Sequence, residues 1–280
     1  MNGEKIAELE KCAWEIRLEL IRMFSYGTPH HLGGSMSCAE LLSCLYFYKM
    51  NYDKARRNDR NRDRLIMSKG HSVPTQYVVL ALLGMYPMEE LRTIKRLGSR
   101  LPGHPDIGKT PGIEAPTGSL GQGLSYANGL ALAGRLDKLS FRVFVLLGDG
   151  ELQEGQVWEA AMTTAQYKLT NVCVIVDRNG YQSQGAVDQL MGIEPVDKKW
   201  EAYGWNTVII DGHSVTEICA ALDWLDGNNK RPLAIIAHTV KGKGVSFLED
   251  TYKYHNYSLN EEEWAQAEKE ILETLEAMNG

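Results

Sequence analysis

Two apolar strands that each end near an oxygen-bearing side chain constrain this chain more than any other feature. Residues 143–147 form a continuous apolar run that ends at Gly148-Asp149-Gly150, and residues 172–176 form a second run that leads to Asn179. Uninterrupted apolar strands are typical of the interior of a parallel sheet. A helix is predicted over residues 156–167, between the two strands in the sequence. This region therefore predicts a βαβ unit.

The remaining periodicities predict a doubly wound α/β fold. Apolar residues at helical spacing indicate helices over residues 5–24, 37–48, 215–225 and 260–278. Short apolar runs at 65–68, 207–210 and 233–236 indicate further strands. Asn260 and Glu263 form a capping-box pair at the start of the last helix. We therefore expect one α/β domain over residues 1–280, with a mostly parallel sheet and helices on both faces.

Three segments show neither the apolar spacing of a helix nor the apolar run of a strand. Residues 30–35 read as a glycine-rich loop, and residues 56–64 mix charges of both signs, which is typical of a solvated loop. Residues 98–123 are dense in Gly and Pro. Long loops in compact domains tend to be functional, so we expect this one to contribute to a site.

Composition excludes several functional classes. A net charge of −6 disfavours a nucleic-acid-binding surface. The five cysteines form no CxxC pair, which favours reduced thiols and a cytoplasmic protein. No apolar run is long enough to span a membrane, and the N-terminus has no signal-peptide core.

Asp149 and Asn179 indicate a metal–diphosphate site. Ligands of open α/β sheets bind beyond the carboxyl ends of the strands, where both residues fall. Mg²⁺ and Ca²⁺ prefer oxygen ligands, so the two side chains and a main-chain carbonyl near Tyr181 would supply three. Gly150 would let the backbone approach the phosphates, and a following helix N-terminus would favour their charge. The alternative is that Gly148-Asp149-Gly150 is merely a turn after a strand.

Other phosphate-binding motifs are missing. The chain has no P-loop pattern. Three Gly-x-Gly segments lack the third glycine of a dinucleotide fingerprint, since Gln153, Tyr126 and Phe247 stand in its place. A nicotinamide-binding domain is therefore disfavoured.

Four histidines, His31, His71, His104 and His255, lie in Gly- or Pro-flanked or polar segments. A single loop histidine is usually a surface residue, but four at one sheet edge would form a hydrogen-bonding set around a polar substrate. No His or Cys spacing matches a zinc site.

Other candidates have weaker claims. His30 and His238 lack a clear role, and His213 is expected to cap the helix that follows it. Glu154 and Glu159 flank the start of the helix after Asp149. Glutamates at such a place often only interact favourably with the positive end of the helix dipole. A carboxylate at that place is also suited to proton transfer.

These segments together resemble transketolase, within the thiamine-diphosphate enzymes, along nearly the whole chain. The matching segments, in the family's order, are RDRLIMSKGH (62–71), LGSRLPGHPD (97–106), TGSLGQGLS (117–125), GDGELQEGQVWEAA (148–161), DRNG (177–180) and TVKGKGVSF (239–247). The chain is similar to the diphosphate-binding N-terminal domain, or to the separately encoded N-terminal subunit of split transketolases.

The resemblance implies a role for each matching residue. It implies thiamine diphosphate and Mg²⁺ or Ca²⁺ as cofactors, with Asp149, Asn179 and the Tyr181 carbonyl as metal ligands. The other implied positions are Gly150, His71 and His255 at the diphosphate, Gly118 and Leu120 at the aminopyrimidine, Lys241 near the thiazolium, His31 and His104 at the sugar hydroxyls, and Glu154 at a subunit interface.

Three positions depart from the family pattern. Arg178 replaces an acidic or amide residue, which we expect to matter little because that position is not a ligand. His30-His31-Leu32-Gly33 stands where Gly-His-Pro-Gly is usual, and the extra histidine is expected to reshape a substrate pocket. Ser183 lies where Ile or Gln is frequent beside the thiazolium.

The family's second, pyrimidine-binding domain has no counterpart in this sequence. The resemblance therefore implies a partner, a C-terminal transketolase subunit carrying that domain, in an α₂β₂ heterotetramer. The implied reaction passes a two-carbon ketol unit from a ketose, anionic by expectation, to an aldose.

Two alternatives remain open. One is another thiamine-diphosphate activity, such as 1-deoxyxylulose-5-phosphate synthesis or a 2-oxoacid dehydrogenase subunit. The four histidines favour polyol substrates over 2-oxoacids. The other is a non-catalytic relic of the fold, against which the intact Asp149 and Asn179 argue.

Overall fold

The computed structural model describes residues 2–24, 29–227 and 230–279, and one parallel sheet organises them. The strand order across the sheet is β1-β2-β3-β5-β4, and every neighbouring pair is parallel. The strands are β1 (Arg64–Met67), β2 (Val143–Gly148), β3 (Val172–Arg178), β4 (Asn206–Asp211) and β5 (Leu233–His238). This confirms the predicted α/β class and the predicted strands.

Helices and short helical turns connect the strands. The α-helices are α1 (Gly3–Phe24), α2 (Leu32–Met36), α3 (Ala39–Cys44), α4 (Val73–Leu82), α5 (Gly123–Leu136), α6 (Gly155–Gln166), α7 (Val187–Leu190), α8 (Val196–Ala202), α9 (Val215–Asp223) and α10 (Glu261–Asn279). The shorter turns are η1 (Leu45–Lys49), η2 (Gly70–Ser72), η3 (Met88–Thr93), η4 (Gly150–Gln153) and η5 (Trp224–Asp226).

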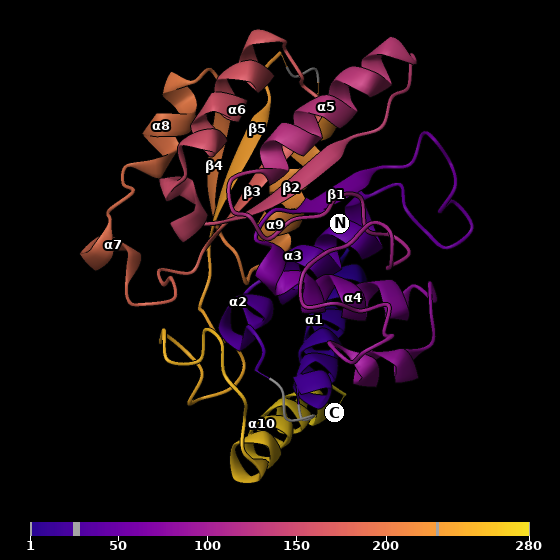
Figure 1. Cartoon of the computed structure of the whole chain (residues 1–280), viewed down its shortest axis with the longest axis vertical. Helices are drawn as coiled ribbons and strands as arrows, with labels where there is room; N and C mark the ends of the chain where they lie inside the picture. Colours follow the sequence, from indigo (N-terminus) through magenta and orange to yellow (C-terminus); the bar gives the residue numbers. More distant parts are fainter. Residues whose placement is uncertain (1, 25–28, 228–229, 280) are drawn as a thin grey trace.

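Alternation along the strands divides the core between the two faces of the sheet. Val143 and Val145 of β2 pack in one apolar cluster with α5, α6 and α8. Phe144 and Leu146 face the opposite cluster, which α1, α3, α4 and α9 cover. Figure 1 shows these two helical layers on either side of the sheet. The helices on both faces explain why the central strands are apolar at every position.

The C-terminal helix α10 begins at the predicted capping box. Asn260 Oδ1 accepts a hydrogen bond from the Glu263 N–H at 2.9 Å, and Glu263 Oε2 accepts one from the Asn260 N–H at 3.1 Å. Ala267, Ile271 and Leu275 form the buried face of the helix, which lies against α1. Met278, the last residue of the predicted apolar face, is 38 % exposed instead.

The glycine-rich segment near the N-terminus is helical, which corrects the predicted loop over residues 30–35. Leu32–Met36 forms α2, and its glycines serve close packing. A Cβ on Gly34 would lie 2.9 Å from Ser72 Oγ, and a Cβ on Gly33 would lie 2.7 Å from Lys241 Cγ. The helix predicted over 37–48 is divided between α3 and the π-helical turn η1. The loop predicted at 98–123 is confirmed up to α5.

His213 joins two parts of the fold and does not cap a helix, which corrects its predicted role. Its Nδ1 lies 3.1 Å from Glu40 Oε2, and its Nε2 accepts the Val240 N–H at 2.8 Å. Ser214 caps α9 instead, accepting the Glu217 N–H at 3.3 Å. Imidazole has two ring nitrogens on opposite sides, so it connects α3 to the segment after β5.

Glu40 is also the partner of a buried arginine. Arg17 of α1 donates two hydrogen bonds to the Glu40 carboxylate, at 2.7 and 2.6 Å. Burial alone would raise the pKa of Glu40, but Arg17 and His213 together outweigh burial and lower this pKa to about 2. The pair is therefore ionised throughout the neutral pH range.

We predict that Glu40→Ala lowers the free energy of unfolding by about 3 kcal/mol, because it leaves the Arg17 charge buried without its partner. Urea denaturation at pH 7 measures this change. Glu276→Ala, at an exposed position of α10, is the matched control and should change stability by no more than about 0.5 kcal/mol. Similar values for both variants would contradict the importance of the pair.

Candidate active site

A cavity of about 360 Å³ opens beyond the carboxyl ends of β2 and β3. Parallel register explains its position, because Gly148 of β2 pairs with Asp177 of β3 and both strands end at the same edge. All the predicted site residues line this cavity: His31, His71, His104, Gly118, Leu120, Asp149, Gly150, Glu154, Asn179, Tyr181, Lys241 and His255. The sequence thus located the site, while the role of each residue stays a prediction.

Asp149 is fixed by the turns that follow β2 and β3. Its Oδ1 accepts the Gly150 N–H at 2.7 Å, and its Oδ2 accepts the Gly180 N–H at 2.6 Å. Burial and the nearby Asp177 carboxylate raise the pKa of Asp149, although both N–H groups oppose the shift. A bound cation would offset that cost, as expected of a buried carboxylate that serves as a ligand.

A short 3₁₀ turn lies between Asp149 and the predicted helix. η4 covers Gly150–Gln153, and α6 begins at Gly155, one residue before its predicted start. The Gly150 N–H donates to Asp149 Oδ1. Gly150 lines the cavity, and its role at a diphosphate stays a prediction.

Asn179 and Tyr181 place two further oxygens in the same cavity. Asn179 Nδ2 donates to Asp177 Oδ2 at 2.8 Å, and Asn179 Oδ1 accepts the Tyr181 N–H at 3.2 Å. The Tyr181 carbonyl accepts a hydrogen bond from Lys241 Nζ at 2.9 Å. The bond to Asp177 orients the amide, because only its nitrogen can donate to a carboxylate.

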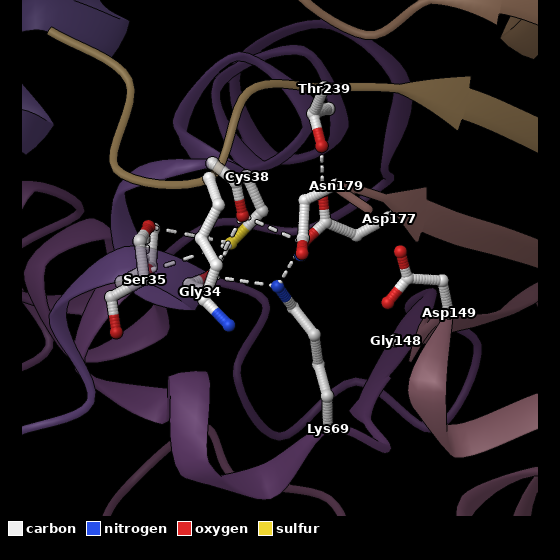
Figure 2. A network of polar contacts seen from close by, with 12 residues as sticks. Gly34, Ser35, Cys38, Lys69, Gly148, Asp149, Asp177, Asn179 and Thr239 are labelled. Atoms are coloured by element: carbon white, nitrogen blue, oxygen red, sulfur yellow. Dashed lines mark hydrogen bonds and ion pairs between the residues drawn. The ribbon is translucent and has the colours of Figure 1, made fainter. Parts of the chain in front are cut away.

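Two residues of this region were not predicted from the sequence to belong to the site. Lys69, after β1, forms a buried ion pair with Asp177 near the end of β3. Asp177 also accepts from Ser37 Oγ at 2.7 Å and from Thr239 Oγ1, and Figure 2 shows this network beside Asp149. Burial would raise the pKa of Asp177, but Lys69 lowers it. A charged residue inside an apolar strand was the signal available, because such a charge needs a partner.

The four predicted histidines form one cluster in the wall of the cavity. The ring centroid of His31 lies 5.1 Å from that of His71, 5.9 Å from that of His104 and 5.3 Å from that of His255. His71 and His255 are 5.2 Å apart. Segments far apart in the sequence therefore bring these imidazoles together.

The cluster is neutral at neutral pH. Burial is the main cause, and it lowers the pKa of His31 to about 4 and that of His255 to about 3. Burial also lowers the pKa of His71 well below its usual value and lowers that of His104. Neutral imidazoles can both donate and accept hydrogen bonds, which suits a ligand with several hydroxyl groups.

Lys241 is a buried cation in the cavity wall, 1 % exposed. Its Nζ donates to the Tyr181 carbonyl and lies 2.9 Å from His255 Nδ1. Burial lowers the pKa of Lys241 to about 8. The ammonium is thus available to an anionic group of a ligand at neutral pH.

Arg178 matters more than the sequence analysis expected. Its Nη1 lies 3.3 Å from Asp149 Oδ2, so it contacts a predicted metal ligand. It also pairs with Asp188 at 2.9 Å and Glu194 at 3.0 Å. Arg178 therefore connects the end of β3 by ion pairs to the segment that contains α7.

His30 is not among the residues that line the cavity, and the expectation that the extra histidine and the lost proline reshape a substrate pocket stays a prediction. Its ring packs on Phe24 at 4.7 Å, and its backbone pairs with that of Tyr257. His238 ends β5 and is exposed. Glu154 and Ser183 are exposed at the cavity rim.

These residues fit a divalent cation and a diphosphate. One carboxylate, one amide oxygen and one carbonyl oxygen form a set of hard ligands of the kind that Mg²⁺ and Ca²⁺ prefer. Within the described ranges, no three His, Cys, Asp or Glu side chains are grouped to hold a metal. Gly150 allows close packing here, because a Cβ there would lie 3.1 Å from Gln182 Cβ.

A parallel α/β sheet with such a cavity at its carboxyl edge defines a cofactor-binding domain. The chain belongs to the transketolase family: residues 10–273 match the family model described as "Transketolase, thiamine diphosphate binding domain". No helix in the described part of the chain is long and apolar enough to cross a bilayer.

Relatives of two lengths match the chain. It is 38 % identical to an apulose-4-phosphate transketolase subunit from Phocaeicola vulgatus, over 98 % of this chain and 97 % of the relative. It is 43 % identical to the 6-deoxy-6-sulfo-D-fructose transketolase subunit SqwG of a Clostridium species, over 86 % and 88 %. Human transketolase is 37 % identical over 99 % of this chain, which spans 44 % of that protein.

Solved structures agree with these relatives. The transketolase of Campylobacter jejuni superposes with a TM-score of 0.86 at 32 % identity, covering 97 % of this chain and 43 % of that one. The comparisons confirm the predicted family, fold and function as a transketolase N-terminal subunit.

We predict that the histidine cluster makes the fold sensitive to acid. Above pH 6.5 His31 is neutral in both the folded and the unfolded chain, and between pH 6.5 and 4 only the unfolded chain takes up its proton. The free energy of unfolding should therefore fall as the pH drops through this window. Urea denaturation should show His31→Gln losing about 1 kcal/mol less per pH unit than the wild type. Parallel pH profiles would contradict a neutral His31.

Proposed function

We propose that this chain is the diphosphate-binding subunit of a two-subunit, thiamine-diphosphate-dependent transketolase. With its partner it transfers a two-carbon ketol unit from a ketose to an aldose. The observation that supports this best is the meeting of the Asp149, Asn179 and Tyr181 oxygens with four neutral histidines in one cavity. The domain boundaries proposed are residues 1–280, as one domain.

Asp149, Asn179 and the Tyr181 carbonyl would hold Mg²⁺, or Ca²⁺, and the cation would neutralise the diphosphate. Gly150, His71 and His255 would contact the phosphate end, Lys241 would lie near the thiazolium, and Gly118 and Leu120 would contact the aminopyrimidine. When bound, thiamine diphosphate supplies the carbanion and the electron sink that carbon–carbon bond cleavage needs.

The protein's own contribution is to orient the sugar and move protons. His31 and His104, with ring centroids 5.9 Å apart, would bond the hydroxyl groups and exchange protons with them. His255 contacts both this pair and the lysine, since its ring centroid lies 5.3 Å from that of His31 and its Nδ1 lies 2.9 Å from Lys241 Nζ. All four are uncharged at neutral pH, so each can pass a proton in either direction.

A partner subunit would complete the site. Glu154 is exposed at the rim of the cavity, where a second chain can reach it. Apolar side chains are exposed nearby, among them Leu190 at 47 % and Met191 at 62 %, beyond the Tyr181 turn. These features support a C-terminal subunit with the pyrimidine-binding domain, in an α₂β₂ assembly. We place the enzyme in the cytoplasm.

The proposed substrates are ketoses with an anionic tail and aldose acceptors. Two relatives are named for apulose-4-phosphate and for 6-deoxy-6-sulfo-D-fructose, which carry a phosphate and a sulfonate. The neutral histidines would suit the polyol part, which both kinds of sugar share.

We predict that Asp149→Asn weakens Mg²⁺-dependent thiamine diphosphate binding by about 100-fold or more, because it removes the charged ligand. Isothermal titration at saturating Mg²⁺ and after EDTA treatment measures this effect. Asp188→Asn is the matched control, since Asp188 also pairs with Arg178 but lies outside the cavity. Undiminished affinity of Asp149→Asn with an intact fold would contradict the ligand assignment.

The reaction itself is tested with the partner subunit present. We predict ketol transfer from sugar phosphates or sugar sulfonates to an aldehyde acceptor, and negligible decarboxylation of pyruvate, because the histidine cluster is built for hydroxyl groups. Coupled assays of both reactions on one preparation give the comparison. Pyruvate turnover without ketol transfer would favour another thiamine-diphosphate activity, and no cofactor binding at all would favour a non-catalytic relic.

A further inference from the structure

Glu151 is a buried carboxylate that joins three segments of the cavity wall. Its Oε1 accepts hydrogen bonds from Ser68 Oγ at 2.5 Å and from the Gly121 N–H at 2.8 Å. Its Oε2 accepts the Gly148 N–H at 3.0 Å. The donors come from the end of β1, from the loop before α5 and from the end of β2, and Glu151 is 2 % exposed.

The loop before α5, which Glu151 contacts at Gly121, packs closely against its neighbours. A Cβ on Gly70 would lie 2.7 Å from the Gly118 nitrogen, and a Cβ on Gly123 would lie 2.3 Å from Ser68 Oγ. Gly121 itself has a φ of +83°, which side-chain-bearing residues rarely adopt. The Gly121 N–H therefore points at Glu151 from a conformation that few other residues would permit.

The charge on Glu151 is supported by these neutral donors. Burial raises its pKa, and the hydrogen bonds from Ser68, Gly121 and Gly148 oppose that shift. Both oxygens face donors, so an amide in this place would turn its NH₂ group against at least one N–H or O–H. The site is thus built for a carboxylate and not for its isostere.

We propose that Glu151 is a positioning residue that sets the distance between the two ends of the cofactor site. On one side it holds Gly121, next to the predicted aminopyrimidine contacts Gly118 and Leu120. On the other side it holds Gly148, next to the predicted metal ligand Asp149. This inference rests on the proposed function, because the two ends are defined by the predicted aminopyrimidine and diphosphate contacts of thiamine diphosphate.

The test compares a long ligand with a short one. Glu151→Gln should lower the affinity of the chain, with its partner subunit, for Mg²⁺-thiamine diphosphate by about tenfold or more. Its affinity for Mg²⁺-pyrophosphate, which occupies one end only, should change less than about twofold. Glu159→Gln, on the exposed side of α6, is the control and should affect neither affinity. Equal losses for both ligands, or no loss, would overturn the proposal.

Hydrogen–deuterium exchange gives a readout that is independent of ligand binding. In Glu151→Gln, amides at 117–123 should exchange at least about tenfold faster, while amides of α10 keep their rates. Ser68→Ala removes one donor and keeps the carboxylate, so it should show a smaller increase at the same place even if the first variant does not fold. Unchanged exchange at 117–123 in Ser68→Ala and in any folded Glu151→Gln would overturn the proposal.

The two hypotheses fail separately. A wild-type chain that binds neither ligand with its partner would contradict the proposed function. A wild-type chain that binds both, beside a Glu151→Gln variant that binds both equally well, would contradict only the role of Glu151.

Discussion

The buried ion pair between Lys69 and Asp177 is the interaction on which the cavity depends. Asp177 accepts hydrogen bonds from Ser37, Lys69, Asn179 and Thr239, so one carboxylate gathers α2, β1, β3 and the segment after β5. Removing one partner of such a pair leaves an uncompensated buried charge, at a cost of about 3–5 kcal/mol. Asp177 of this pair orients the Asn179 amide. The orientation of a predicted metal ligand therefore depends on a charge that is not itself a predicted ligand.

The carboxylates at and beside the cavity are all bonded. Asp149 pairs with Arg178, Asp177 pairs with Lys69, and Glu151 accepts three hydrogen bonds from neutral groups. The repulsion of an incoming anion by these carboxylates is reduced because their charges are already bonded to donors of the protein. A cation that brings a diphosphate with it adds little net charge, and so meets a modest desolvation penalty on entry.

The sequence predicted the sheet and the ligand candidates because both follow from rules that act along the chain. Uninterrupted apolar runs identified β2 and β3, and parallel strands end at one edge, so Asp149 and Asn179 had to lie close together. A charge in an apolar strand signals that Asp177 needs a partner, but it does not identify Lys69. That choice depends on register between strands, and the Glu151 junction depends on a loop that docks from elsewhere in the chain. His30 and His31 are neighbours in sequence, yet one packs on Phe24 and the other enters the cavity.

The contact of His213 with both Glu40 and Val240 has a practical consequence for protein engineering. It makes the layer of α1 and α3 a support for the strand end that precedes Lys241. Substitutions of Glu40 or His213 would therefore disturb the backbone segment that leads to Lys241, so stabilising libraries for this chain would leave both positions unchanged.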